Sequence, residues 1–209
     1  MAYNLTAASS QYLSTASAPA TTTPLTLACW FRPTNVADTR YVLSLGAATA
    51  NGAHSIYQSV NNLYAVSTDT SSNQSAISIS GLSNTWIHVC AVFSANNNRQ
   101  IYANGTAGTA NTSTRNPANI AAFRIGSVFY NGAIGYYANA NIAEVGIWNA
   151  ALTAAEIAPL AKGMTCDKVR PESLVFYAPL VRDLIDQKGG LTITNNNAAT
   201  VAAHPRIYP

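Results

Sequence analysis

The sequence RIGSVFYNGAIGYYANANIAEVGIWNAALTAAEI, from Arg124 to Ile157, decides the fold. Its apolar positions predict a short strand at 123–125 and a longer strand at 141–148. Between the two strands lies a connection rich in tyrosine and in glycine and asparagine, and the last two residue types favour turns. The stretch therefore indicates antiparallel β-structure that ends in one short helical segment.

The helical segment carries the clearest local signal. Thr153 and Glu156 form the T-x-x-E pattern of a capping box, in which each side chain binds the backbone N–H of the other residue. Leu152 and Ile157 have the spacing of the hydrophobic staple that accompanies such a cap. We therefore expect one short helix over residues 153–161.

Upstream, the residue pattern is that of strands. Alternate positions of 25–31 are apolar, which predicts a strand with one buried face. Residues 86–93 (WIHVCAVF) are apolar at nearly every position, which predicts a central strand. Asn104-Gly105 is a strong signal for a two-residue hairpin, and Asn61-Asn62 is a weaker one between strands at 54–60 and 63–67.

Three blocks of the sequence resemble laminin-G-like, concanavalin A-like jelly-roll domains, and they occur in the family order. These blocks are LTLACWFRP (25–33), TWIHVCAVFSANNNRQIYANG (85–105) and IAEVGIWNAALTAAEI (142–157). One departure is Ala143, which stands where the family usually has aspartate. The resemblance implies an all-β antiparallel sandwich of the jelly-roll type.

The C-terminal segment LVFYAPLVRDLIDQKGGLTITNNNAATV (174–201) resembles the segment that ordinarily opens these domains. Its position at the end of the chain predicts a circularly permuted sandwich. We therefore expect a single domain over residues 1–209, in which residues 172–203 supply strands that complete the sandwich and residues 204–209 form an extended tail. The alternative is a C-terminal arm that docks on a neighbouring subunit.

The bulk composition excludes some partners. Charged residues make up 9% of the chain, and the net charge of +3 comes from basic residues that form no run. Nucleic-acid binding needs a basic patch, so it is not expected. No apolar stretch is long enough to span a membrane, and the N-terminal residues MAYNLTAASSQYL have no features of a signal peptide.

Cysteine usage leaves two interpretations open. Cys29 and Cys90 lie within apolar predicted strands, while Cys166 lies elsewhere. We expect buried free thiols that behave as small apolar residues. The alternative is a cross-strand disulfide between Cys29 and Cys90, which would indicate an oxidising compartment.

The acidic residues give little support for catalysis or for metal binding. A glycosidase needs two carboxylates on opposite sides of the bond that it cleaves. No two of the eight acids lie on one face of one predicted strand; the acids are Asp38, Asp69, Glu144, Glu156, Asp167, Glu172, Asp183 and Asp186. We expect no enzyme activity and no cofactor. Calcium binding is not supported, because the loops contain few carboxylates.

A binding role remains, and the tyrosine-rich loop is its best candidate. Tyrosine and asparagine are suited both to glycans, through ring stacking and amide hydrogen bonds, and to protein interfaces. We therefore expect the ligand-contacting residues to be Phe129, Tyr130, Asn131, Tyr136, Tyr137 and Asn139. These aromatic side chains could equally serve only to pack over the edge of the sandwich.

The resemblance extends to stand-alone domains of tailed-bacteriophage virions. It implies a non-enzymatic structural protein, of the capsid-decoration or head-fibre type, that contacts capsid or other virion proteins after synthesis in the bacterial cytoplasm. The alternative is a lectin module of a tail or fibre that binds host-surface glycans, and a third class is a glycan hydrolase. Whether the chain forms a homo-oligomer is left open.

Overall fold

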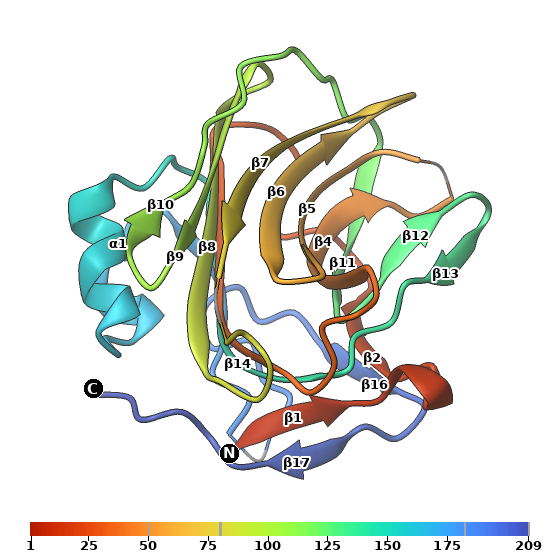
Figure 1. Cartoon of the computed structure of the whole chain (residues 1–209), viewed down its shortest axis with the longest axis vertical. Coiled ribbons are helices and arrows are strands. Elements are labelled where there is room, and N and C mark those ends of the chain that lie inside the picture. Colours follow the sequence, from red (N-terminus) through yellow and green to blue (C-terminus); the bar gives the residue numbers. More distant parts are fainter. Residues whose placement is uncertain (50, 80, 182, 209) are drawn as a thin grey trace.

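The two strands with the strongest apolar patterns, β3 (Leu25–Pro33) and β8 (Ile87–Ala95), pair with each other in the middle of one sheet. The computed structural model, which describes residues 1–49, 51–79, 81–181 and 183–208, folds as two antiparallel sheets packed face to face (Figure 1). The all-β antiparallel sandwich expected from the sequence is confirmed.

The first sheet, called sheet A, has the order β10-β9-β8-β3-β14-β1-β17, and β15 also pairs with β14. Its remaining strands are β1 (Ala2–Leu5), β9 (Asn98–Ala103), β10 (Thr106–Ala107), β14 (Ala140–Trp148), β15 (Leu174–Ala178) and β17 (Thr200–Ala202). The Asn104-Gly105 turn joins β9 to β10 with positive φ at both residues, as its sequence predicts.

The second sheet, called sheet B, has the order β16-β2-β11-β4-β5-β6-β7. Its strands are β2 (Tyr12–Thr15), β4 (Arg40–Ala47), β5 (Ala53–Ser59), β6 (Asn62–Thr68), β7 (Ser72–Ser78), β11 (Ile120–Ile125) and β16 (Ile193–Asn196). A separate hairpin of β12 (Val128–Tyr130) and β13 (Ala133–Gly135) projects beside sheet B (Figure 1).

Within the described residues, one α-helix, α1 (Ala154–Ala161), covers the outer face of sheet A, and two 3-10 turns lie at Ala7–Ser9 and Cys166–Lys168 (Figure 1). The capping box is present, because the Thr153 hydroxyl accepts from the Glu156 N–H and the Glu156 carboxylate accepts from the Thr153 N–H at 2.7 Å. Leu152 and Ile157 are both buried. The expected helix is confirmed. No helix within the described ranges is long and apolar enough to cross a membrane.

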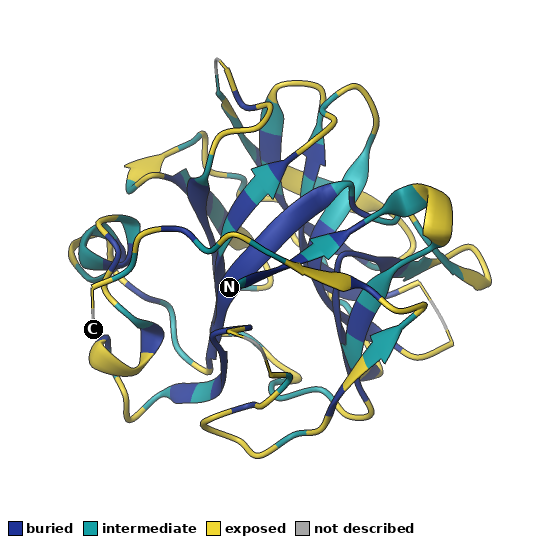
Figure 2. Cartoon of the chain, turned by 90° about the horizontal axis from the view of Figure 1, so that it is seen from below, coloured by how far each residue is buried: buried dark blue, intermediate teal, exposed yellow. Residues whose placement is uncertain are grey.

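The interior has two apolar layers, one between the sheets and one between sheet A and α1 (Figure 2). Thr26 and Ala28, at even positions in the first half of β3, are therefore buried as well as the odd positions, although the alternating sequence predicts only one buried face. Cys29 lies in the first layer, and Cys90 and Cys166 lie in the second. All three thiols are free, since Cys29 and Cys90 occupy opposite faces of sheet A.

Strand β14 changes its neighbour halfway along. Residues 140–142 pair with β1 from the N-terminus, and residues 145–148 pair with β15 from the C-terminal segment. A bulge against β3 separates the two halves, and Glu144 lies in it with a φ of 52°. The two ends of the chain therefore meet along one edge of β14.

The C-terminal segment contributes to both sheets. Strand β16 pairs with β2 in sheet B, and β17 pairs with β1 at the edge of sheet A. Residues 204–208 then run past α1, where the N–H of Tyr208 donates to the carbonyl of Gly163 at 2.7 Å. Pro209, the last residue of the expected tail, lies outside the described residues. The permuted origin of this arrangement stays a prediction.

The hairpin between β5 and β6 differs from the sequence expectation by one residue. Its loop is Val60-Asn61 and not Asn61-Asn62, because Ser59 pairs with Asn62. As a result Val60, which is exposed, has a φ of 52°. A β-branched residue is strained in this left-handed region.

Replacing Val60 with glycine is expected to raise the free energy of unfolding by about 1 kcal/mol, because glycine adopts positive φ without a Cβ clash. The measurement is chemical denaturation of both proteins. Asn84→Gly is the matched control, since Asn84 is also exposed and has a φ of 56°, but asparagine tolerates this conformation. A larger gain from Asn84→Gly than from Val60→Gly would contradict the argument.

Buried histidines make stability depend on pH. Burial lowers the pKa of His88 to about 3, and its Nδ1 has no hydrogen-bond partner among the described residues. The unfolded chain, in which a histidine has a pKa near 6.5, therefore binds more protons than the folded chain below that pH. The stabilisation is complete above about pH 6.5 and is lost as the pH falls from there to about 3, the pKa in the folded chain.

His88→Leu is expected to make this fall in unfolding free energy shallower by about 3 kcal/mol between pH 6.5 and pH 4. The measurement is urea denaturation of both proteins across that range. His54, which is also buried and has its pKa lowered to about 4 by burial and by Arg99, keeps part of the pH dependence in the variant. Parallel pH profiles of the two proteins would contradict the assignment.

Candidate functional site

A groove of about 290 Å³ lies on the outer face of sheet B, beside the β12–β13 hairpin. Ile56 and Ala65 of β5 and β6 point into the core, so the alternation of the strands directs Tyr57 and Tyr64 outward into the groove. The groove is lined by Thr39, Tyr41, Tyr57, Ser59, Tyr64, Val66, Ser72, Gln74, Tyr130 and Tyr136. Half of these side chains are tyrosines.

Three tyrosines form a ladder across sheet B. Tyr41, Tyr57 and Tyr64 are direct cross-strand neighbours on β4, β5 and β6. The ring centroids of Tyr57 and Tyr64 are 4.5 Å apart with an interplanar angle of 14°, and those of Tyr41 and Tyr57 are 5.3 Å apart. Ala76 of β7 is the next residue in register, so no ring covers the far side of Tyr64. The faces of Tyr57 are thus occupied by its neighbours.

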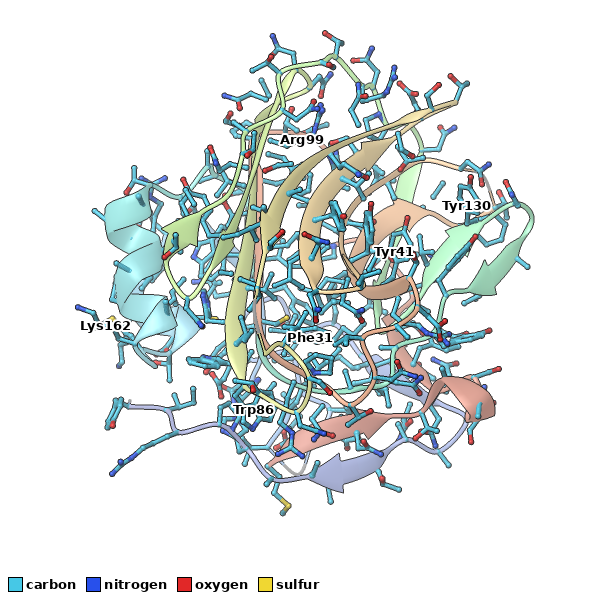
Figure 3. All side chains as sticks on the ribbon, viewed as in Figure 1. Phe31, Tyr41, Trp86, Arg99, Tyr130 and Lys162 are labelled. Atoms are coloured by element: carbon cyan, nitrogen blue, oxygen red, sulfur yellow. The ribbon has the colours of Figure 1, made fainter. Side chains whose placement is uncertain are left out.

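Two more tyrosines line the groove beside the ladder: Tyr130 of the hairpin, which lies near Tyr41 (Figure 3), and Tyr136, which directly follows β13. The ring of Tyr136 lies 5.8 Å from Tyr41 and 5.8 Å from Tyr130, at steep angles to both. The carbonyl of Tyr136 also accepts a hydrogen bond from the N–H of Tyr41 at 3.0 Å. Tyr130 and Tyr136 are 36% and 45% exposed, so their rings are open to a ligand.

Two contacts fix the hairpin in place. At its tip, Asn131 and Asn51 exchange hydrogen bonds of 2.8 and 3.2 Å. At its base, the ring of Phe129 lies under the buried guanidinium of Arg124, 5.9 Å from the ring centroid. The wall of the groove is therefore held before any ligand binds, which lowers the entropy cost of binding.

The groove presents uncharged polar groups. Tyr57 donates a hydrogen bond to Oε1 of Gln74, which leaves the Gln74 amide nitrogen without a partner among the described residues. The hydroxyls of Thr39 and Ser59 bind each other at 2.9 Å. Burial, together with the nearby Tyr130 and Tyr136, raises the pKa of Tyr41 to about 12, so its phenol stays neutral near pH 7.

The structure brings only part of the expected site together. Tyr130 and Tyr136 line the groove, whereas Asn131 and Phe129 fix the hairpin. Their assignment as ligand contacts stays a prediction for each residue.

Tyr137 and Asn139 make contacts away from the groove. The Tyr137 ring packs against Tyr12 of β2, and its hydroxyl donates to the carbonyl of Ile134 at 3.0 Å. The Asn139 side chain accepts from the N–H of Ala7 at 2.8 Å. Tyr137 thus packs against sheet B, and Asn139 holds the first 3-10 turn next to the start of β14. The sequence does not distinguish these two residues from Tyr130 and Tyr136, because the residue types of a loop do not indicate which way each side chain points.

Sequence reasoning missed the tyrosine ladder. Tyr57 and Tyr64 flank the β5–β6 turn, and the correct loop places them opposite each other. An Asn61-Asn62 loop would instead place Tyr57 opposite Val66 and separate the two rings. The signal was the symmetric spacing of the two tyrosines about Val60-Asn61.

A second polar cluster surrounds the buried Glu144. Tyr177 donates to one carboxylate oxygen at 2.5 Å, and Nε2 of His204 lies 3.1 Å from the other. Burial and the neighbouring Glu144 raise the pKa of Tyr177. Both oxygens are thus engaged, and the cluster joins the C-terminal residues to the β14 bulge. Among the described residues, no group of three or more His, Cys, Asp or Glu could hold a metal ion.

Comparison with known proteins gives a family and a set of similar folds. A family model of the concanavalin A-like lectin/glucanases superfamily matches residues 7–158. No curated protein sequence is significantly similar to the chain.

Several solved structures have the same fold at low sequence identity. A candidate carbohydrate-binding protein of Bacteroides ovatus is 16% identical with a TM-score of 0.70, over 99% of this chain and 61% of its own. The chain therefore spans about three fifths of that protein. A heptameric SAP-like pentraxin of Limulus polyphemus is 19% identical (TM-score 0.64, covering 93% and 89%). The CBM40 of a Ruminococcus gnavus IT-sialidase, bound to α2,3-sialyllactose, is 11% identical (TM-score 0.57, covering 68% and 84%).

Proposed function

The chain belongs to the concanavalin A-like lectin/glucanases superfamily, and we propose that it is a carbohydrate-binding, lectin-like protein that holds glycans in the tyrosine groove without catalysis. The observation that carries this proposal is the groove itself, in which five tyrosines and several hydroxyl and amide groups converge on a preformed surface. Small-molecule sites are typically concave and aromatic, with a small number of polar groups that orient the ligand.

Ring orientation gives each tyrosine a different part in this proposal. The exposed rings of Tyr130 and Tyr136 stack on the apolar C–H face of a sugar. Tyr57 presents its ring edge and hydroxyl instead, because Tyr41 and Tyr64 occupy its two faces. Two structural relatives have carbohydrate binding in their descriptions, which agrees with this use of the fold.

The double variant Tyr130→Ala/Tyr136→Ala is expected to weaken glycan binding at least tenfold, because it removes both open rings. The measurement is binding of wild type and variant to an immobilised glycan panel, followed by calorimetry on the strongest ligand. A tenfold loss corresponds to about 1.4 kcal/mol.

The matched control is Tyr208→Ala, which removes another exposed tyrosine that lies beside α1, on the sheet A side of the sandwich and away from the groove. It should leave binding unchanged. Equal losses in the two variants, or no glycan bound by the wild-type protein, would refute the proposed site.

The catalytic alternative is addressed by Glu144→Gln. Both carboxylate oxygens of Glu144 already have partners, so we propose a structural role and no hydrolysis at this residue. If the wild-type protein released sugar from a glycan and Glu144→Gln abolished the release, the non-enzymatic proposal would be wrong.

We further propose that this binding serves a bacteriophage virion, as the sequence resemblance implies, either as capsid decoration or within a head fibre or tail. A chain with 9% charged residues and three free buried cysteines is suited to close packing against virion proteins after synthesis in bacterial cytoplasm. Mass spectrometry of purified particles is the test. Hundreds of copies would indicate capsid decoration, a handful would indicate a fibre or tail, and absence would refute the virion role.

A further inference from the structure

We infer that the groove accepts the end of a neutral glycan, one or two sugar units, by a mode that needs neither a metal ion nor a charged group on the ligand. This inference rests on the proposed function and specifies its ligand class. It is independent of how the structural relatives recognise their own ligands.

The first argument is the absence of charge in the groove. None of the ten lining side chains among the described residues is acidic or basic. The charged residues that flank Thr39 in sequence are Asp38 and Arg40, and they bind each other at 2.7 Å. A carboxylate or sulfate on a glycan would lose its hydration here without gaining a cationic partner, which is strongly unfavourable.

The second argument is the set of polar groups that the protein leaves open. Four tyrosine hydroxyls in the groove make no hydrogen bond to another described residue, and none of them is a buried atom without a partner; they belong to Tyr41, Tyr64, Tyr130 and Tyr136. A phenol hydroxyl both donates and accepts, and the free Gln74 amide nitrogen donates two hydrogen bonds. These groups complement sugar hydroxyls, which also donate and accept.

The third argument concerns metal ions. Calcium sites need several oxygen ligands that include carboxylates. The lining of the groove offers hydroxyls and one amide, whose oxygen already accepts from Tyr57. A sugar must therefore bind to the protein directly.

The fourth argument is size. The groove volume of about 290 Å³ lies at the lower limit of ligand pockets, which span roughly 300–1,000 Å³. The β12–β13 hairpin closes one side, where Tyr130 stands. The other side opens over Ser72 and Gln74 of β7, so the rest of a longer glycan would leave the groove across that edge of sheet B.

The test is a panel of paired oligosaccharides that differ only by sialic acid or sulfate, exposed to the full chain with EDTA and, in parallel, with calcium. The inference predicts binding to neutral members, equal in both buffers and little affected by salt. Preference for acidic members, or loss of binding in EDTA, would overturn it and leave the proposed function standing. Binding of no member in either buffer would overturn both.

Gln74→Glu provides a sharper readout with an isosteric change. The carboxylate still accepts from Tyr57, so folding is retained, but the two amide donors are lost and a charge enters the groove. Affinity for neutral glycans should fall at least tenfold with an unchanged melting temperature. Asn73→Asp, on the same strand outside the lining, is the matched control and should retain affinity. Unchanged affinity in Gln74→Glu would contradict the inference.

Discussion

A chain truncated after Pro171 is expected to lose cooperative folding, because residues 172–208 supply β15, β16 and β17. Strand β15 pairs with the central strand β14, and its Leu174, Phe176 and Ala178 are buried. Phe176 packs edge-to-face on Phe123 of sheet B at 5.2 Å, so the loss reaches both sheets. Removing one large aromatic side chain from a core already costs about 3–5 kcal/mol, a large part of the stability of a domain.

The measurement is thermal unfolding by circular dichroism, with amide exchange to detect residual structure. The matched control ends at residue 203 and keeps all three strands. It loses the pairing of His204 with Glu144 and the backbone contact of Tyr208, so it should unfold cooperatively at a lower temperature.

This experiment decides between the two interpretations of the C-terminal segment. We propose that residues 172–203 complete a single domain over residues 1–209. If the chain that ends at Pro171 melts like the full chain, the segment is instead an arm whose natural place is on another subunit.

The sequence predicts the strands well where a single physical pattern acts alone. Alternation marks β3, an apolar run marks β8, and the T-x-x-E pattern marks α1, because each signal depends only on residues close in sequence. The strand pairings are harder to predict. The bulge at Glu144 and the exchange of β1 for β15 along β14 depend on where the two chain ends meet.

The groove illustrates the same limit. Tyr130 and Tyr136 could be predicted as candidates from the composition of their loop. The ladder of Tyr41, Tyr57 and Tyr64 could not, because it requires the register of three strands. That register depends on Val60, whose positive φ a sequence pattern does not favour.

Arg99 was also not singled out by the sequence, and its replacement is the second change with a large expected effect. Its side chain has no exposed surface and lies on β9, under the connection that leads to β11 (Figure 3). Nε donates to Ser67 of sheet B at 3.1 Å, and Nη1 donates to the side chain of Asn111 at 2.6 Å. Nη2 donates to the carbonyls of Asn96 and Ser113 at 2.7 and 2.8 Å.

No carboxylate pairs with this guanidinium among the described residues, and burial lowers the pKa of Arg99. Neutral oxygen atoms thus accept the hydrogen bonds that a carboxylate would accept in an ion pair. The acceptors lie on β6 of sheet B, in the turn between β8 and β9, and in the 104–119 connection, so one side chain holds three parts of the fold together.

Arg99→Met is expected to lower the free energy of unfolding by at least about 3 kcal/mol, because four acceptors would lose their donors at roughly 1–3 kcal/mol each. For a chain of this length the melting temperature should fall by about 6–12 °C. Arg99→Lys should recover only part of the loss, since a single ammonium group does not reproduce the planar fork. The measurements are urea denaturation and calorimetry.

Arg115→Met is the matched control. Arg115 is partly exposed, and its nearest carboxylate oxygen, on Asp69, is 3.9 Å away, so its loss should cost less than about 1 kcal/mol. An unchanged or higher stability of Arg99→Met would also have a physical basis, because an apolar side chain avoids the free-energy cost of burying a charge and can stabilise a core. A variant Arg99→Met as stable as wild type would mean that this cost cancels all four hydrogen bonds. The connection would then be held by backbone contacts such as the Arg99–Asn111 pair, whose two bonds measure 3.0 and 3.1 Å.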